Sequence, residues 1–417
     1  MADSPKNKSK DYEQMEDLFK YMYESLNKSK LSGSMKDKIV DEIGKLKSFT
    51  VDARAPRIAL VGRRGSGKSS LINAIFGEYK AEVGDIKSKT GRGTWYTYEG
   101  ELGEMEILDT RGLGESEAPD EETSAADPVS EVKASIKEKC PDVILFLAKA
   151  KEVGARIDED AVQLLDLKKE VNTIHDYDVP VIGVVTQVDE LAPLSDSTPP
   201  FSSPRKQENI ESSVEMLGDK LEEIVSTPIK VIPVCSYMEF DNGKIVYDLR
   251  WNVDVLVDYL VKELPTEAQV ILAKLSKIKS VQKKLARKIG KGVAGVTGIV
   301  GASPIPGSDM PIITSLQISM VGSIAMIGGT KINKRKIIDF IGALGVNAGV
   351  GFALREVARQ AVKIFPGAGS VISGSLATAG TYALCEAAIK YFIDYRSADE
   401  AKKTFEKELD AKREELG

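Results

Sequence analysis

Cysteine and histidine are scarce in this chain of 417 residues. The three cysteines, Cys140, Cys235 and Cys385, lie far apart and form no CxxC pair. Their spacing favours neither a disulfide framework nor a zinc site, and a reducing compartment fits best. His175 is the one histidine of the sequence. This shortage excludes histidine-rich metal sites and disfavours a serine or cysteine triad.

A strong charge of one sign and long, strongly apolar runs are also lacking. The chain has 57 Lys and Arg against 63 Asp and Glu, a net charge of −6, and 42% hydrophobic residues. Its mean hydropathy is −0.16. This composition is typical of a folded protein, and its mild acidity argues against a general nucleic-acid binder. Because the N-terminal residues are polar and lack the apolar stretch of a secretory signal, we expect a cytoplasmic protein.

The hydrophobic pattern and the composition of the sequence change twice along the chain. Residues 1–54 carry apolar side chains at helical spacing, and short β-rich runs then alternate with helical stretches. From about residue 265 the chain is rich in Gly, Ala and Ser. We predict an N-terminal helical segment (1–54), an α/β domain with a doubly wound, mostly parallel sheet (55–265) and an all-α C-terminal domain (266–417). The expected strands are residues 57–61, 95–98, 105–108, 143–148, 181–185 and 230–234.

The most specific motif is GRRGSGKS at residues 62–69, between an expected strand and an expected helix. It satisfies the GxxxxGK[ST] pattern of a phosphate-binding loop. Glycines let successive backbone N–H groups point at phosphates, and the helix N-terminus adds its positive dipole end. We expect Lys68 to contact the β- and γ-phosphates and Ser69 to ligate Mg²⁺. The remaining residues assigned to this cradle are Arg64, Gly65, Ser66, Gly67 and Ser70.

Asp109 and Gly112 form a DxxG pattern that starts where the expected strand 105–108 ends. An Asp in this place holds Mg²⁺, usually through water, and the amide of Gly112 senses the γ-phosphate. Because the pattern follows a phosphate loop, the order resembles the GTPase superfamily rather than kinases or other ATPases. Leu113 stands where many small GTPases carry a water-positioning Gln, a substitution that marks the Era-like branch. Hydrolysis must therefore draw on another group, water network or partner.

Thr186, Gln187 and Asp189 resemble the [NT]KxD motif of the same family. The resemblance implies that Asp189 accepts hydrogen bonds from the N1–H and the exocyclic amine of guanine. Gln187 departs from the family's Lys and loses the stem and charge that usually lie over the base, so we expect modest affinity. Ser236 and Tyr237 resemble the last guanine-side loop, in which a backbone amide meets the base oxygen.

The resemblance also implies a threonine in the first switch that completes the Mg²⁺ shell. Thr90 and Thr94 are the candidates, and we favour Thr94 because the expected strand 95–98 follows it immediately. Three arginines near the phosphate motifs are solvated loop charges in the simplest interpretation and charge stabilisers in the alternative: Arg63, Arg64 and Arg111.

The C-terminal region carries a second resemblance. PIPGSD at 304–309, LQISM at 316–320 and FPGAG at 365–369 look like the helical domain of unknown function appended to some bacterial Era-like GTPases. The layout is also similar to immunity-related GTPases, relatives of dynamin-like proteins that act at membranes. For the uncharged run 310–330 three interpretations stay open: a helical bundle packed in water, association with a membrane, and helical hairpins that pack in solution and open onto lipid when the nucleotide state changes. Its Ser, Gly, Thr and Gln content favours the bundle.

The sequence therefore predicts an Era-like GTPase that binds GTP and GDP with Mg²⁺ and hydrolyses GTP slowly unless it is activated. The predicted catalytic residues are Lys68, Thr94 and Gly112, and the predicted metal ligands are Ser69, Thr94 and Asp109. The helical flanks are expected to read the nucleotide state. Expected partners are a second copy of the chain and a membrane surface, with no nucleic acid. The alternative is a non-catalytic, nucleotide-gated scaffold, which Gln187 and Leu113 support.

Overall fold

The computed structural model describes residues 10–29, 31–80, 95–109, 128–154, 157–302, 310–330, 334–344 and 369–414. The chain divides into two compact units. The sheet unit is Ala55–Lys277, and the helical unit joins Met1–Arg54 to Ile278–Gly417. The three-part division at residues 54 and 265 stays a prediction.

The sheet unit is built on a six-stranded sheet with the order β2-β3-β1-β4-β5-β6. The five inner and far-edge strands are parallel, and β2 (Trp95–Glu99) runs antiparallel beside β3. The parallel strands are β1 (Arg57–Val61), β3 (Glu104–Asp109), β4 (Val143–Lys149), β5 (Val181–Thr186) and β6 (Lys230–Pro233). In β4 only the last residue is not fully buried, as expected for a strand covered on both faces. The predicted doubly wound, mostly parallel sheet is confirmed.

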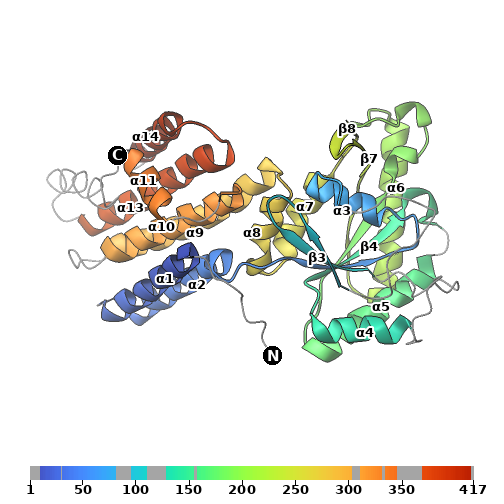
Figure 1. Cartoon of the computed structure of the whole chain (residues 1–417), viewed down its shortest axis with the longest axis horizontal. Helices are drawn as coiled ribbons and strands as arrows, with labels where there is room; N and C mark the ends of the chain where they lie inside the picture. Colours follow the sequence, from blue (N-terminus) through green and yellow to red (C-terminus); the bar gives the residue numbers. More distant parts are fainter. Residues whose placement is uncertain are drawn as a thin grey trace. The chain divides into compact units, whose positions relative to one another are not determined.

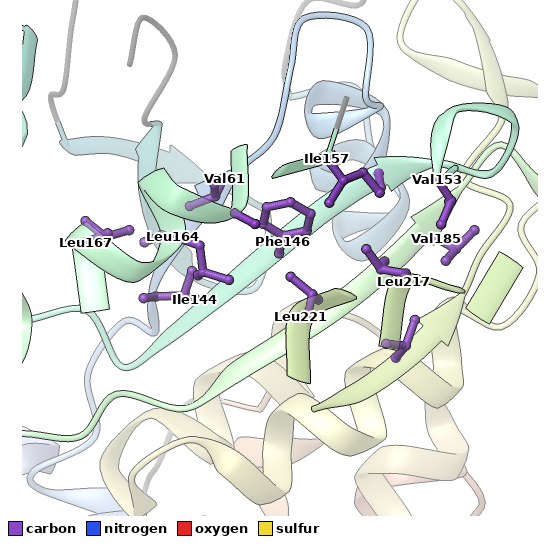
Figure 2. Close-up of a cluster of buried hydrophobic side chains, with 14 of the residues drawn as sticks. Val61, Ile144, Phe146, Val153, Ile157, Leu164, Leu167, Val185, Leu217 and Leu221 are labelled. Carbon is purple, nitrogen blue, oxygen red and sulfur yellow. The ribbon is translucent and has the colours of Figure 1, made fainter. Parts of the chain in front are cut away.

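Helices cover both faces of this sheet (Figure 1). On one face lie α4 (Pro128–Glu138), α5 (Ile157–His175) and α6 (Pro204–Val225). On the other lie α3 (Lys68–Phe76), α7 (Val253–Glu263) and α8 (Thr266–Leu275). Figure 2 shows the first layer, in which Phe146 of β4 packs among Leu164 of α5 and Leu221 of α6. This packing fixes the strand ends from which the loops described below begin.

A two-stranded antiparallel hairpin follows the last strand of the sheet. It consists of β7 (Met238–Asp241) and β8 (Lys244–Asp248). Asn242 and Gly243 form its turn with φ values of 47° and 75°. Asn-Gly is the preferred pair for such a turn, a signal that the sequence analysis did not use. The described part of the unit also contains three short 3₁₀ turns: η1 (Ala150–Glu152), η2 (Val188–Glu190) and η3 (Leu194–Asp196).

The helical unit combines both ends of the chain. Its helices are α1 (Lys10–Lys28), α2 (Gly33–Thr50), α9 (Lys279–Gly301), α10 (Met310–Ile327), α11 (Lys334–Ala343), α13 (Gly369–Ala388), a π-helical turn η4 (Ile389–Ile393) and α14 (Ala398–Glu414). The N-terminal helices pack against α9 and α10, and α13 packs along α9. The predicted helical flanks are confirmed. None of the helices in the described ranges is both long and apolar enough to cross a membrane.

Candidate nucleotide-binding site

The loop between β1 and α3 has the backbone of a phosphate cradle. Gly62, Gly65 and Gly67 have φ values of 150°, 75° and 88°, a region that L side chains rarely adopt. At Gly62 a Cβ atom would lie 2.5 Å from the carbonyl oxygen of Leu147. Gly67 is also the N-cap of α3. The loop therefore needs its glycines, and it directs the N-terminus of a helix toward the space that the loop encloses.

Lys68 and Ser66 are the buried polar side chains of this loop. Lys68 is 5% exposed, and its ammonium donates to the carbonyl oxygen of Gly62 and, at 3.2 Å, to that of Arg63. The Ser66 hydroxyl is buried and, within the described part of the chain, has no hydrogen-bond partner. Ser69 and Ser70 follow in the first turn of α3 and are half-buried. The loop thus holds an ammonium and hydroxyl groups beside its backbone amides.

The segment after β5 is hydrogen-bonded to this loop. The Thr186 hydroxyl donates to the carbonyl oxygen of Ser66 at 2.8 Å, and the Gln187 side-chain amide donates to that of Gly65 at 2.8 Å. Gln187 adopts a left-handed conformation with φ of 57°, which turns the chain sharply at the end of the strand. Gln187 therefore keeps a donor that reaches the phosphate loop, although the motif has lost its lysine.

Asp189 and Cys235 meet beside this segment. Asp189 lies in η2, and Cys235 is fully buried and held by two backbone hydrogen bonds to Trp251, of 3.1 and 3.0 Å. Burial and the adjacent Asp189 carboxylate raise the pKa of the Cys235 thiol to about 12. The thiol therefore stays protonated at neutral pH. In the sequence, Cys235 belongs to the segment that resembles the last guanine-side loop, but no local signal predicts that it lies beside Asp189.

Ser236 and Tyr237 differ in exposure. Ser236 is 8% exposed, and its hydroxyl is a second buried group with no hydrogen-bond partner among the described residues. Tyr237 is 46% exposed, contacts the ring of Tyr247 edge-on and donates to the Glu239 carboxylate, a hydrogen bond that raises the pKa of the phenol. Both residues lie next to Cys235, just beyond β6.

The strand register brings these segments to one edge of the sheet. Leu60 of β1 pairs with Asp109 of β3, and Lys149 of β4 pairs with Thr186 of β5. Parallel strands end at the same edge, and β1 is the point at which the strand order reverses direction, where α/β sheets bind ligands. The phosphate loop and the segments after β5 and β6 therefore converge.

Some predicted residues lie outside this description. Asp109 is the last residue of β3, where it pairs with Leu60 of β1. Outside the described residues lie Thr90, Thr94, Arg111, Gly112 and Leu113, whose roles stay predictions. Of the two loop arginines, Arg63 is paired through Nε with Asp160 of α5 at 2.9 Å, and Arg64 is exposed. Whether either arginine stabilises charge on a nucleotide stays a prediction.

Comparison with known proteins identifies this part of the chain. Residues 57–187 match the model of a family described as 50S ribosome-binding GTPase. They form a GTPase domain of the Era-like class. The GTPase Der of Fusobacterium nucleatum is 29% identical over 149 residues, which are 34% of this chain and 33% of that protein. The domain therefore binds GTP and belongs to a class of GTP hydrolases.

Other similar proteins extend beyond the GTPase domain. The uncharacterized protein YfjP of Escherichia coli K12 is 26% identical over 294 residues, which are 68% of this chain and 88% of that protein. Toc33 of Arabidopsis thaliana, solved with Mg²⁺ and GMPPNP, is 14% identical with a TM-score of 0.34, over 60% of this chain and 95% of that chain. LeoA, a bacterial dynamin GTPase from ETEC, is 15% identical with a TM-score of 0.34. The match covers 95% of this chain and 73% of that chain.

Proposed function

We propose that this protein hydrolyses GTP with Mg²⁺ and that its helical unit reads the nucleotide state. The observation that carries the proposal is the pair of hydrogen bonds from Thr186 and Gln187 to the carbonyl oxygens of the phosphate loop. These bonds join the segment that precedes Asp189 to the loop that contains Lys68. One nucleotide can then contact both, with its phosphates in the loop and its base at Asp189.

The phosphate loop supplies the charge stabilisation for the reaction. In the proposed mechanism the Lys68 ammonium exchanges its carbonyl partners for the β- and γ-phosphates, and the loop amides stabilise the charge on the phosphate oxygens. The Ser66 hydroxyl, buried inside the loop without a partner among the described residues, is a donor that a phosphate oxygen satisfies. Arg64, Gly65, Gly67 and Ser70 line the same cradle in this proposal.

The proposed Mg²⁺ ligands are Ser69, Asp109 and Thr94. Hydroxyl and carboxylate oxygens are the hard ligands that Mg²⁺ prefers, and Ser69 lies in the first turn of α3, directly after Lys68. When bound by these residues, the ion would neutralise charge on the nucleotide phosphates. Gly112 senses the γ-phosphate through its amide, so that the state of the phosphate decides the conformation of the switch segments.

Orientation of the attacking water needs a group other than Leu113, whose side chain makes no hydrogen bonds. We propose that a second copy of the chain supplies it across the nucleotide face, so that the hydrolysis rate per molecule rises with protein concentration. Peripheral attachment to a membrane in one nucleotide state is part of the same proposal. Co-sedimentation with liposomes in the GDP and GTP states tests that attachment.

In this proposal Asp189 recognises the guanine base. Its carboxylate accepts from N1–H and the exocyclic amine, two donors that adenine does not offer together. Ser236, with its amide, and Tyr237 complete the base side in this proposal.

The test compares phosphate release from GTP, ATP and XTP by the wild type, Asp189→Asn and the control Asp219→Asn, which changes an exposed acid on α6. Xanthine has a carbonyl oxygen where guanine has its amine, so the side-chain amide that the substitution introduces can donate to it. We expect wild type and control to prefer GTP and Asp189→Asn to shift the GTP/XTP ratio by about a hundredfold toward XTP. Equal turnover of ATP and GTP by the wild type contradicts the base assignment, and bound GTP without phosphate release supports the scaffold alternative.

A further inference from the structure

We propose that Lys206 is a positioning residue for guanine recognition, which fixes the specificity loop (residues 187–191) so that Asp189 faces the base. This inference rests on the proposed role of Asp189. Lys206 lies in the first turns of α6, outside every motif of the GTPase class. It acts through Asp189 and is not a catalytic residue.

The ammonium of Lys206 is buried against the specificity loop. The residue is 0% exposed, and Nζ donates to the carbonyl oxygens of Asp189 and Leu191, both at 2.6 Å. It also lies 5.0 Å from the centre of the Phe201 ring. A lysine is almost never fully buried unless its charge is compensated. Here two main-chain carbonyl groups and an aromatic ring compensate the charge of the ammonium. Burial lowers the pKa of Lys206.

The specificity loop depends on such an external contact. It starts with the left-handed Gln187 and continues as a single 3₁₀ turn, closed by the amides of Glu190 and Leu191. One turn of this kind is a weak structure by itself, because its hydrogen bonds are few and poorly aligned. A cation that binds the carbonyl groups of Asp189 and Leu191 together fixes the backbone on both sides of Glu190. The Asp189 side chain is then attached to a backbone that is held in place.

Lys206 is itself held in place by the start of α6. The Asp196 carboxylate accepts hydrogen bonds from the amides of Ser202 and Ser203, at 3.0 and 2.8 Å. Asn209, one turn further along the helix, donates to the carbonyl oxygen of Ala192 at 2.8 Å. These bonds anchor the connection between η2 and α6 at both of its ends. The Lys206 ammonium is therefore held at a fixed position beside the specificity loop.

The two sides of Asp189 belong to one packed group. Phe201, which contacts the Lys206 ammonium, packs edge-on against Trp251 at 5.2 Å, and Trp251 is bonded through its backbone to Cys235. The Asp189 carboxylate is close enough to Cys235 to raise the pKa of its thiol. Lys206 thus holds the backbone of Asp189, and Cys235 lies on the other side of this group. The motif has lost the lysine that normally stands at position 187, and Lys206 provides a cation at the same loop from another helix.

The experiment measures the affinities of the purified full-length chain for GDP and IDP with a fluorescent nucleotide competitor. Inosine lacks the exocyclic amine, so the Kd ratio IDP/GDP reports the hydrogen bond between that amine and Asp189. We expect Lys206→Met to weaken GDP binding about tenfold and to bring the IDP/GDP ratio close to one. Lys206→Gln keeps a neutral donor and is the second variant if the Met variant does not fold; it is expected to lower the ratio by a smaller factor.

Lys168→Met is the matched control, because Lys168 also joins a helix to a loop of the GTPase domain. Its ammonium donates to Asp178 and, at 3.2 Å, to the carbonyl oxygen of Val179. This variant should melt at a lower temperature with an unchanged IDP/GDP ratio. An unchanged ratio in both Lys206 variants, or equal losses for GDP and IDP, reduces Lys206 to a structural role and overturns the inference. A wild type without preference for GDP over IDP overturns the role of Asp189 as well, which separates the two failures.

Discussion

Two sets of buried polar side chains, one in the sheet unit and one in the helical unit, make different kinds of contact. In the sheet unit the buried donors Lys68, Thr186 and Lys206 bond to main-chain carbonyl groups of loops. In the helical unit, Thr297 of α9 and Gln317 of α10 bond to the Thr381 hydroxyl of α13, each at 2.9 Å. The buried side chains of the sheet unit fix the loops of the candidate nucleotide site. The buried side chains of the helical unit connect three helices through hydrogen bonds.

The glycines of the phosphate loop and Gly290 of α9 also have different tasks. Gly62, Gly65 and Gly67 have positive φ values and shape a loop. Gly290 lies in the middle of α9, where its missing side chain lets α13 approach, since a Cβ there would lie 2.8 Å from Cβ of Cys385. The first use concerns backbone conformation and the second concerns packing distance. Substitutions should therefore harm nucleotide chemistry in one unit and stability in the other.

The largest effect should come from Lys68→Ala, which removes the ammonium of the phosphate loop. We expect GTP hydrolysis to fall by at least about a hundredfold, because the charge on the transferred phosphoryl group loses its main compensation. Phosphate release at saturating GTP measures it. Lys133→Ala, which breaks an ion pair of α4 with Glu170, is the control and should keep its rate. A Lys68 variant with half of the wild-type rate would remove this residue from the proposed mechanism.

The second effect is on the packing of α9 against α13. Gly290→Ala should destabilise the protein by about 1–3 kcal/mol, because the new methyl group overlaps Cys385. Gly295→Ala on the same helix meets no described atom within 4 Å and should stabilise by about 0.5–1 kcal/mol through helix propensity. Urea unfolding of the two variants measures the difference. Equal shifts in both would mean that glycine serves flexibility here rather than close approach.

The GTPase domain could be predicted in more detail than the residues that position its loops. The phosphate loop is local, since its glycines, Lys68 and the following helix are adjacent in sequence, and the strands followed from their apolar runs. Lys206 could not be predicted, because the carbonyl groups it binds belong to another element and only tertiary packing brings them together.

In the helical unit, too, the sequence predicts the elements but not their contacts, for a different reason. Weak polarity and small residues predicted helices there, but not which helices face one another. Thr297 and Thr381 are far apart in sequence and bond across α9 and α13. Nothing in the local pattern around either threonine distinguishes this contact from an ordinary exposed hydroxyl. Pairings of this kind depend on the helix crossing, which no single segment encodes.

The third prediction concerns this threonine pair. Thr381→Val should destabilise by about 1–2 kcal/mol, because the buried Gln317 amide and Thr297 hydroxyl lose a partner. Adding Gln317→Leu should recover part of this loss, since it removes the amide left unpaired, together with an oxygen that has no hydrogen-bond partner among the described residues. Thermal unfolding of the single and double variants measures the coupling. Additive losses would show that the threonine matters for its shape alone.

The smallest effect should come from Glu106, an acid on β3 of the sheet unit. Its carboxylate accepts from Arg57 of β1 at 2.9 Å and from Lys139 at 2.5 Å. Burial by itself raises the pKa of Glu106, but the bonds from Lys139 and Arg57 outweigh it and hold the pKa below the ordinary 4.5. This ion group joins neighbouring strands and is the sheet unit's counterpart of the threonine pair.

A pKa that is lower in the folded state stabilises the protein above the unfolded-state pKa, and this contribution disappears as the pH falls through the folded-state pKa. Glu106→Gln should therefore cost about 1 kcal/mol at pH 7, and the difference from wild type should shrink below pH 4.5. Urea unfolding between about pH 3.5 and 7.5 measures this profile. Glu104→Gln, at an exposed position of the same strand, serves as the control. A difference for Glu106→Gln that stays constant with pH would mean that the carboxylate contributes through shape and hydrogen bonding rather than charge, and would bring it closer to the neutral polar contacts of the helical unit.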